Sequence, residues 1–389
     1  MNERLIIDLL AKSLYEVLNH KVSIDVAFKR ACKGKCASSL NEREELYNLV
    51  RNFISDYFKI ICVIGKNKRV SLKELARRWI KGLNNIPDTI PCRLSYSEWF
   101  YEKIINLLGF HEGVKLLSAL NERKWWLRIN TLITSEEKVL RMLDEEGVEY
   151  DIDKDYPFVV KIRSSPKPVR LLKPVKEFKA IPQDKASVMV VDVLKPEPGD
   201  VIADLASAPG LKTSLIMMLT ENRSKIVAID VSLKRLKIMR VLLKRLGVNL
   251  SNVSLVLADS RDIRVRGINK ALLDAPCSNS GAIDKDPGIK IHINQGKIDY
   301  YSRLQKELLE NALRLDAEEV VYATCSLMPE EGEEVISYIA QKFEFKLVKE
   351  IKWLSNGYKL VGFYDKLMRA FPHIHDTEAF FIAKIVKKS

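Results

Sequence analysis

Two cysteines in the second half of the chain have neighbours that suggest chemistry rather than packing. Cys277 lies in residues 274–281, D-A-P-C-S-N-S-G, and Cys325 lies in residues 323–331, A-T-C-S-L-M-P-E-E. Each cysteine comes shortly after an apolar run that we expect to form a strand, and each is followed by a serine. A free cysteine is most often a small buried hydrophobic residue. Two of them at strand ends, where parallel sheets bind ligands, favour a chemical role for both thiols.

Three aspartates stand at the ends of three further apolar runs. Asp204, Asp230 and Asp259 close the segments V-I-A-D, K-I-V-A-I-D and S-L-V-L-A-D. A single aspartate in such a position is more often a helix cap, but three of them at the carboxyl ends of successive parallel strands indicate a ligand site. An acid after the second strand can accept hydrogen bonds from both hydroxyls of a ribose, which is the role that we expect for Asp230.

The segment after the first of these strands predicts the kind of ligand. Residues 204–213, D-L-A-S-A-P-G-L-K-T, place small residues and a glycine where a backbone must approach a ligand closely. They then open a helix whose N-terminus favours a carboxylate. Neither G-x-G-x-x-G nor G-x-x-x-x-G-K-[ST] occurs in the sequence, which argues against a dinucleotide or a nucleoside triphosphate. S-adenosylmethionine, which carries a carboxylate, a ribose and a sulfonium cation but no phosphate, fits this loop best.

These segments belong to a stretch of alternating strands and helices that begins near residue 181. The predicted strands and helices are, in order, 201–204, 212–221 (helix), 225–230, 232–246 (helix), 254–259, 270–274, 304–313 (helix) and 320–323. This alternation predicts an α/β fold with a doubly wound, mostly parallel sheet. The sheet would bring the two cysteines and the three aspartates to one edge.

The first 180 residues divide into two parts. Apolar residues at helical spacing predict an all-helical domain over residues 1–85, and a cluster of glycine, asparagine and proline near its end marks a boundary. Residues 93–180 combine helical patterns with strands near 125–130 and 159–162, which predicts a small α+β module. The third domain is then 181–389.

The charge of the chain indicates a polyanionic partner. The formal net charge is +13 and the sequence pI is about 9.2, with +9 of the charge in residues 1–180 and +4 in residues 181–389. Seven basic residues and a single acid, Glu177, lie between Lys161 and Lys179. This strip is predicted to follow the phosphates of a nucleic acid. The alternatives are a basic protein with a solvated surface and, for the strip, a solvated loop.

The six cysteines are too few for a disulfide scaffold in a chain of 389 residues, so we expect reduced thiols in a reducing compartment. Cys32 and Cys36 lie four residues apart, but no second Cys/His pair at zinc-site spacing accompanies them, and we expect no metal. The N-terminus lacks the apolar core of a signal peptide, and no run of about 18 apolar residues could span a membrane. We therefore expect a cytoplasmic monomer with no membrane partner.

The three motifs around the aspartates and cysteines resemble those of the RNA (cytosine-5) methyltransferase family that contains the bacterial ribosomal enzyme Fmu, or RsmB, and the eukaryotic Nop/Sun proteins. The family's D-x-C-A-A-P-G-G-K-T is similar to residues 204–213, its D-A-P-C-S-G-x-G to 274–281 and its S-T-C-S-[LI]-x-P-E-E to 323–331. Its Q-D-x-[AS]-S segment is similar to 183–187, and its P-H-x-H-x-T-D-G-F-F segment is similar to 371–381.

This resemblance covers roughly residues 120–389 and implies a Rossmann-like class I methyltransferase domain. It also implies that the module at 93–180 binds RNA. More loosely, by pattern and position, the helices of residues 1–85 are similar to the NusB-like RNA-binding extension of the RsmB branch.

The resemblance implies a covalent mechanism. Carbon 5 of cytosine is a poor nucleophile, but a thiolate that adds to carbon 6 makes carbon 5 enamine-like, so that it takes a methyl group from the sulfonium. The attacking thiol of the family corresponds to Cys325, and the thiol that helps to release the methylated base corresponds to Cys277. Asp274 would protonate or hydrogen-bond ring nitrogen 3. Lys212 is a candidate for the cation that gives Cys325 thiolate character. The target base must leave its stack.

The resemblance also implies a cofactor site. Residues 206–212 would surround the methionine part, Asp230 would hold the ribose, Asp259 would lie near the adenine, and Arg235 would assist near the second strand. The full set of expected cofactor-binding residues is Asp204, Ala206, Ser207, Ala208, Pro209, Gly210, Leu211, Lys212, Asp230, Arg235, Asp259 and Asp274. Leu211 replaces the family's second glycine, which narrows the approach to the methionine part. The other departures are Ala206-Ser207 for Cys-Ala, Asn279 for Gly and Ala379 for Gly, and none removes a group that the chemistry needs.

The sequence leaves the substrate open. Ribosomal RNA is favoured by analogy, because the NusB-like helices resemble those of an enzyme that acts on small-subunit ribosomal RNA, and tRNA is the alternative for the same chemistry. A non-catalytic RNA-binding assembly factor is disfavoured by the presence of Cys277, Cys325 and Asp274. A small-molecule methyltransferase is disfavoured by the basic first half and the additional domains.

Overall fold

The computed structural model describes residues 3–34, 36–65 and 69–388, which form two compact units. The first unit combines Met1–Arg123 with the later segment Asn279–Gln295, and the second combines Lys124–Ser278 with Gly296–Ser389. The three-domain division expected from the sequence, 1–85, 93–180 and 181–389, stays a prediction. No helix in the described ranges is both long enough and apolar enough to cross a membrane.

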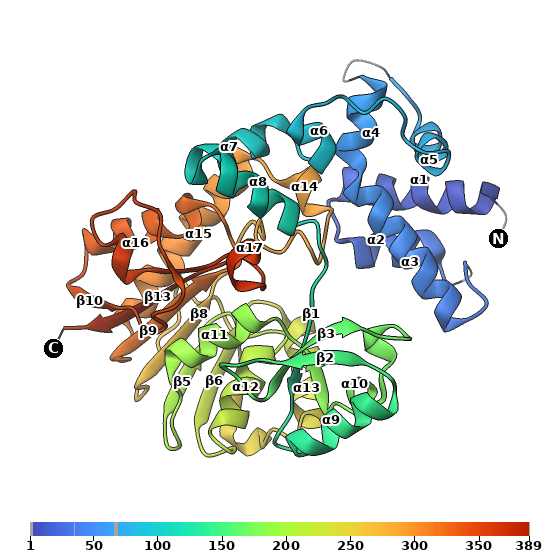
Figure 1. Ribbon diagram of the computed structural model, residues 1–389. Helices are drawn as coiled ribbons and strands as arrows, with labels where there is room; N and C mark the ends of the chain where they lie inside the picture. Colours follow the sequence, from blue (N-terminus) through green and yellow to red (C-terminus); the bar gives the residue numbers. More distant parts are fainter. Residues whose placement is uncertain (1–2, 35, 66–68, 389) are drawn as a thin grey trace. The chain divides into compact units, whose positions relative to one another are not determined.

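The first unit is helical (Figure 1). Serines at the N-caps start several of its helices: the side chains of Ser39, Ser71 and Ser97 each accept a hydrogen bond from a backbone N–H in the first turn. Apolar stripes from the first five helices share one core. The helices of this unit are α1 (Glu3–His20), α2 (Ile24–Cys32), α3 (Leu40–Ser55), α4 (Tyr57–Ile64), α5 (Leu72–Ile80), α6 (Ile90–Leu94), α7 (Glu98–Leu108), α8 (Phe110–Ala119) and α14 (Ile289–His292).

Two disulfides lie in the first unit. Cys32 pairs with Cys36, and Cys62 in α4 pairs with Cys92 in α6, with Cα atoms 4.9 and 5.8 Å apart. The expectation of reduced thiols is therefore wrong for these four cysteines. Overall cysteine content says nothing about local geometry, and α4 and α6 bring two distant cysteines into contact. Cys277 and Cys325 remain as free thiols.

The second unit contains a small antiparallel sheet of strand order β2-β3-β1-β4. As predicted, strands form at Trp125–Ile129 (β1) and Val159–Ser164 (β3), and they pair with Trp125 opposite Ile162. Leucine, isoleucine and valine side chains from the sheet and from α9 share a core beneath it. The other elements are β2 (Glu149–Ile152), β4 (Ala180–Pro182), α9 (Glu136–Glu145) and α10 (Lys173–Lys176).

The larger sheet of this unit has nine strands in the order β11-β12-β13-β9-β8-β5-β6-β7, with β10 pairing β13. The run from β9 to β7 is parallel, and β10 to β13 add an antiparallel edge. This is the predicted doubly wound, mostly parallel α/β fold. The strands are β5 (Val201–Asp204), β6 (Lys225–Asp230), β7 (Val253–Leu257), β8 (Lys270–Asp274), β9 (Glu319–Thr324), β10 (Phe345–Val348), β11 (Ser355–Asn356), β12 (Met368–Ala370) and β13 (Phe380–Lys387).

Helices cover both faces of this sheet (Figure 1). Alternate residues of β5 show why: Ile202 joins the core formed with α11, α12 and α13, whereas Ala203 joins the core formed with α15 and α16. Chain order reverses at β5, because β6 and β7 lie on one side of it and β8 and β9 on the other. Ligands bind at such a switch point. These helices are α11 (Lys185–Leu194), α12 (Leu211–Leu219), α13 (Leu233–Arg245), α15 (Gln295–Arg314), α16 (Glu333–Ala340) and the short α17 (Pro372–His375).

Candidate active site

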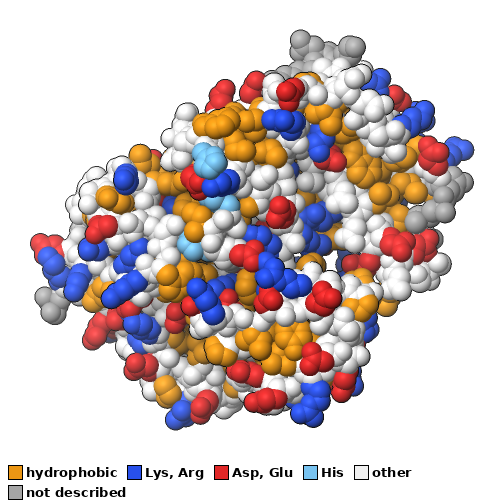
Figure 2. Space-filling model, in the orientation of Figure 1, with side chains coloured by type: hydrophobic (Ala, Val, Ile, Leu, Met, Phe, Trp, Pro, Cys, Tyr) orange, Lys and Arg blue, Asp and Glu red, His pale blue; other side chains and the backbone are white. Residues whose placement is uncertain are grey.

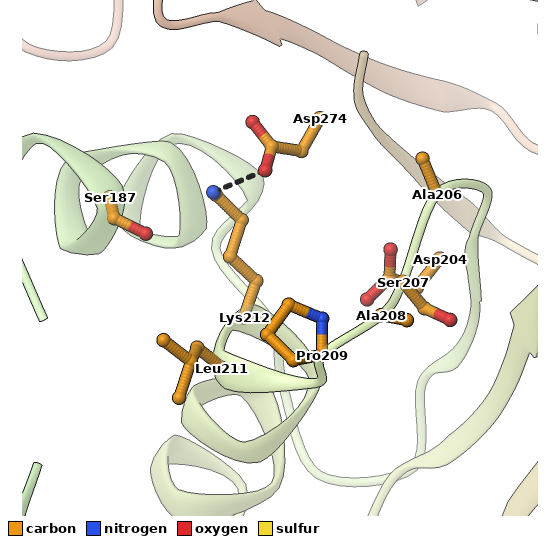
Figure 3. Close-up of a pocket in the computed structure, with 9 residues that line it drawn as sticks. All are labelled: Ser187, Asp204, Ala206, Ser207, Ala208, Pro209, Leu211, Lys212 and Asp274. Atoms are coloured by element: carbon orange, nitrogen blue, oxygen red, sulfur yellow. Dashed lines mark hydrogen bonds and ion pairs between the residues drawn. The ribbon is translucent and has the colours of Figure 1, made fainter. Parts of the chain in front are cut away.

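A pocket lies at the carboxyl ends of β5 and β8, at the switch point of the sheet (Figure 3). Most of its lining comes from the loop that joins β5 to α12, and the opposite wall includes Asp274 at the end of β8. The lining residues are Ser187, Asp204, Ala206, Ser207, Ala208, Pro209, Leu211, Lys212 and Asp274. Eight of these nine belong to the predicted cofactor-binding set.

The loop from β5 to α12 is held against the second strand and its helix. The hydroxyl of Ser207 donates to the carbonyl of Ile229, at 3.0 Å. Gly210 caps α12 with φ of 99°, a conformation that favours glycine, and a Cβ there would lie 2.8 Å from the Met239 side chain. Gly210 therefore shapes the turn without lining the pocket. Leu211 does line it, so the departure from the family's glycine faces the space where the cofactor is expected.

Asp204 is almost completely buried at the base of the pocket. Its carboxylate accepts a hydrogen bond from the Thr213 hydroxyl at 2.7 Å, which ties β5 to the first turn of α12. Burial raises the pKa of Asp204 to about 6, and the negative charge of Asp274 contributes to the rise. Asp204 is thus both a structural tie and a titratable group beside the pocket.

Lys212 crosses the pocket and forms an ion pair with Asp274 (Figure 3). Its ammonium also lies 5.5 Å from the centre of the Phe380 ring, which fixes the side chain from a second side. The partner that the structure gives Lys212 is therefore Asp274. The suggestion that Lys212 promotes the thiolate of Cys325 stays a prediction.

Ser187 was missed as a site residue. It lies near the start of α11 and its side chain points toward Lys212 in Figure 3. The signal was present in the sequence, because residues 183–187 match a family segment, but that segment gave no role for its last serine. Asp184, which caps α11 by accepting from the Ala186 N–H, explains how the segment presents Ser187 at this place.

Asp230 and Arg235 lie next to the pocket loop but do not line the pocket. The Asp230 carboxylate accepts hydrogen bonds from the backbone N–H groups of Ala208 and Ser232, at 3.3 and 2.9 Å. Arg235 forms an ion pair with Asp230 at 3.1 Å and donates to the Ala208 carbonyl. These contacts join the end of β6 to the pocket loop, and the roles of Asp230 and Arg235 in binding the cofactor stay predictions.

Asp259 has a different environment from the other two strand-end acids. Strand β7 ends at Leu257, two residues earlier than predicted, so Asp259 lies in the loop that follows. Its carboxylate is bound by the backbone N–H and the guanidinium of Arg261, which lowers its pKa. Asp259 does not line the pocket, and its role near an adenine stays a prediction.

The two free cysteines meet at the ends of β8 and β9. These strands pair in parallel with Asp274 opposite Ala323, so the loops that follow them run side by side. The sulfur atoms of Cys277 and Cys325 lie 3.2 Å apart. Cys277 is buried, at 4% exposure, whereas Cys325 is half-buried. Asp274 relates the thiols to the pocket: it lines the pocket at the end of β8, and Cys277 follows it by three residues in the next loop.

The basic strip of residues 161–179 is less free than its composition suggests. Many of its cations are paired with carboxylates, as the ion pairs Lys161–Asp376, Arg163–Asp151, Lys167–Glu146 and Lys179–Glu177 show. On the face drawn in Figure 2, Lys and Arg side chains are interspersed with Asp and Glu. The contact of the strip with phosphates stays a prediction.

Comparison with known families gives two matches. A family model described as 16S rRNA methyltransferase RsmB/F matches residues 191–386. A second model, an RsmF/B-like ferredoxin-like domain, matches residues 96–170. The first match includes Asp204, Asp230, Asp259, Asp274 and both cysteines of the site, but not Asp184 or Ser187.

Named relatives act on two kinds of RNA. The 28S rRNA (cytosine-C(5))-methyltransferase of Mus musculus is 32% identical over 335 residues, which are 82% of this chain and 42% of that protein. The tRNA (cytosine(49)-C(5))-methyltransferase of Pyrococcus abyssi is 36% identical over 219 residues, which are 53% of this chain and 70% of that protein. The chain spans about half the length of the eukaryotic rRNA methyltransferases that it matches.

Solved structures with similar folds include one that matches the whole chain and others that match about three quarters of it. The crystal structure of PH0851 has a TM-score of 0.82 and 27% identity, and the match covers 100% of this chain and 99% of that one. NSun6 from Pyrococcus horikoshii, solved with SFG, has a TM-score of 0.68 and 26% identity, over 75% of this chain and 99% of that one. The similarity to PH0851 therefore extends over both compact units.

Proposed function

This chain belongs to the RsmB/F family of methyltransferases, and from this membership we propose that it transfers a methyl group from S-adenosylmethionine to carbon 5 of a cytosine in RNA. The observation that carries the proposal is the pair of free thiols, Cys277 and Cys325, with sulfur atoms 3.2 Å apart beside a pocket lined by Asp274. A binding protein has no need of two adjacent thiols at the ligand edge of a sheet.

The side chains around the pocket suit S-adenosylmethionine. The carboxylates of Asp204 and Asp274 are part of the pocket lining, and negative charge there favours binding of a sulfonium cation. The start of α12, with Leu211 and Lys212 in the lining, favours the carboxylate of the methionine part. Asp230, which already holds the Ala208 N–H, is the acceptor for ribose hydroxyls. The bound cofactor supplies an electrophilic methyl group.

Cys325 is the nucleophile in this proposal. Its thiolate forms a C–S bond to carbon 6 of the cytosine, and the electron pair of the 5,6 double bond becomes available at carbon 5 for methylation. Asp274 hydrogen-bonds or protonates ring nitrogen 3 and so withdraws electrons during the addition. Cys325 suits this role better than Cys277 because it is half-buried, whereas Cys277 is 4% exposed.

Cys277 takes part in the second half of the reaction. After methylation the proton on carbon 5 passes to a base, for which we assign the thiolate of Cys277. The electrons of that C–H bond re-form the 5,6 double bond, and the Cys325 sulfur departs from carbon 6 as a thiolate. Cys277 lies 3.2 Å from that sulfur, so it is placed to assist this departure. One thiol then makes the covalent bond and its neighbour helps to break it.

We propose ribosomal RNA as the substrate, with tRNA as the alternative. The rRNA methyltransferase match covers 82% of this chain and the tRNA methyltransferase match covers 53%. Residues 1–85 and the module at 93–180 are proposed to bind this RNA, with the chemistry in 181–389. We propose that the chain acts as a monomer, because one chain holds all of the residues assigned to the reaction.

The test is methyl transfer to separate RNA pools. Purified protein is incubated with S-adenosylmethionine labelled in the methyl group and with unmodified ribosomal RNA or tRNA, and the labelled base is located by bisulfite sequencing. We expect label at carbon 5 of cytosine in ribosomal RNA and none with Cys325→Ala. Label in tRNA alone would select the alternative substrate. RNA binding without any transfer would overturn the proposal in favour of a non-catalytic assembly factor.

A further inference from the structure

Glu331 is a fully buried carboxylate close to both free cysteines. It ends the short helical turn Pro329–Glu331, six residues after Cys325, and its side chain is 0% exposed. Burial raises its pKa, while the hydrogen bonds that it accepts act in the opposite direction. A buried acid needs hydrogen-bonding partners to be tolerated, so the groups that surround it show what it does.

The partners of Glu331 are the residues that follow the two cysteines. Ser278, next to Cys277, donates its backbone N–H to Oε1 at 2.7 Å and its hydroxyl to Oε2. Ser326, next to Cys325, donates its hydroxyl to Oε2 at 2.6 Å. The two hydroxyl oxygens lie 3.4 Å apart. One carboxylate therefore binds both cysteine loops, and we call Ser278, Ser326 and Glu331 the carboxylate clamp.

Other contacts fix the clamp to the fold. The backbone carbonyl of Glu331 accepts from the Tyr322 hydroxyl at 2.8 Å and from the Thr324 hydroxyl at 3.2 Å, both on β9. Gln305 of α15 donates to Oε1 of Glu331 at 3.2 Å and to the Pro276 carbonyl at 2.9 Å. Contacts from β9 and α15 thus hold the clamp in place. Glu331 is connected to the loop of Cys277 directly through Ser278 and indirectly through Gln305, which binds the Pro276 carbonyl.

An ionised carboxylate suits this place because the hydrogen bonds to its oxygens from Ser278, Ser326 and Gln305 all come from donors. An ionised carboxylate offers two oxygens with about four acceptor sites and donates nothing. Ser278 uses two of these sites, and Ser326 and Gln305 use one each. An amide in the same place would turn one oxygen into a donor, so one of the serine contacts would be lost or reversed.

We propose that Glu331 is a positioning residue that sets the distance between Cys277 and Cys325 and so controls both formation and release of the covalent base adduct. This proposal rests on the proposed function for its chemistry. Glu331 touches neither thiol among its described hydrogen bonds, and it acts through the serine beside each one. A misplacement of about 1 Å at reacting atoms can lower a rate about 100-fold, so loss of the clamp is expected to affect catalysis strongly.

The first test compares Glu331→Gln with Glu334→Gln, the same change at an exposed acid three residues later. We expect Glu331→Gln to lower kcat about 10- to 100-fold, with KM for RNA and for S-adenosylmethionine changed less than twofold. Glu334→Gln should match the unaltered protein. Ser278→Ala and Ser326→Ala remove single contacts, so each should lower kcat less, and adding either to Glu331→Gln should have little further effect. A kcat of Glu331→Gln within twofold of the unaltered protein would overturn the proposal.

The second test measures thiol spacing without any methyl transfer. Diamide, an azo oxidant, takes up two hydrogens as two thiols join in a disulfide, and peptide mapping then reports the Cys277–Cys325 link. We expect this link to form about tenfold more slowly in Glu331→Gln than in Glu334→Gln. Equal rates would overturn the positioning role whatever the substrate proves to be. A slower rate in a protein that methylates no cytosine would leave the clamp in place and refute only the proposed function.

Discussion

The sulfur atoms of Cys277 and Cys325 lie 3.2 Å apart although 48 residues separate them in the sequence. Two parallel strands produce this proximity, because β8 and β9 pair with Asp274 opposite Ala323 and each cysteine follows its strand within three residues. A nucleophile and a helper of its departure must both approach carbons 5 and 6 of one base. Adjacent thiols at the ends of adjacent strands meet this requirement.

The first prediction concerns the covalent adduct. Cys277→Ala should allow Cys325 to add to the base but slow its release, so a protein–RNA adduct that survives denaturation should accumulate on a gel. Cys325→Ala should give neither adduct nor methyl transfer, while binding of S-adenosylmethionine persists. An adduct formed by Cys325→Ala, or none formed by Cys277→Ala, would reverse or refute the two assignments.

Much of this site can be predicted from the sequence, because its residues lie in short continuous motifs. A parallel sheet brings the ends of the strands that carry these motifs to one edge. Residues 204–213 provide most of the pocket lining, where the motif predicts the cofactor, and Asp274 lies on the opposite wall. The ion pair between Asp274 and Lys212 is not among the predictions, which assign Lys212 to the thiolate of Cys325. Asp259 was placed less well, because β7 ends early and Arg261 binds the acid. No periodicity predicts where a side chain finds its hydrogen bonds. The clamp role of Glu331 therefore required coordinates.

The two disulfides of the first unit were not predicted, for a related reason. Cys62 and Cys92 are 30 residues apart, and only the packing of α4 against α6 brings them together. Gly210 shows the opposite case: the sequence predicts a glycine that lets the backbone approach a ligand, and its φ of 99° is a conformation that favours glycine, although Gly210 itself does not line the pocket. The type of a residue predicts which backbone conformation it can adopt, but it does not predict which distant residue it will contact.

The second prediction concerns the cofactor. Asp230→Asn removes the charge from the expected ribose acceptor, and loss of a charge-assisted hydrogen bond of about 1.5–3 kcal/mol should weaken S-adenosylmethionine binding about 10- to 150-fold. Isothermal titration calorimetry measures this. Asp316→Asn is the matched control, because this exposed aspartate lies between α15 and β9, before the amino end of β9 and outside the pocket lining, and it should change the affinity less than fivefold. Equal affinities for Asp230→Asn and the unaltered protein would exclude Asp230 from the cofactor site.

The third prediction concerns pH and stability. Burial raises the pKa of Asp204 from 3.8 to about 6, so the folded state binds a proton more tightly than the unfolded state between these values. The ionised carboxylate therefore lowers the free energy of unfolding progressively as pH rises from about 4 to 6. Asp204→Asn should raise that free energy at pH 7.5 by about 1–3 kcal/mol, and the difference should vanish near pH 4. Chemical denaturation at several pH values measures it, and a destabilised variant at pH 7.5 would contradict the assigned cause.

The fourth prediction concerns the disulfides of the first unit. A cross-link stabilises a protein mainly by restricting its unfolded chain, and the effect grows with the length of the closed loop. The Cys62–Cys92 bond closes a separation of 30 residues and the Cys32–Cys36 bond only 4. Replacing Cys62 and Cys92 by serine should therefore lower the free energy of unfolding by about 3–4 kcal/mol, and replacing Cys32 and Cys36 should lower it by about 2 kcal/mol. Denaturant titration of the two double variants measures the difference.

Four reactive thiols in the non-reduced, denatured protein, in addition to Cys277 and Cys325, would show that neither bond forms. A larger loss for the Cys32 and Cys36 variant would contradict the loop-length argument.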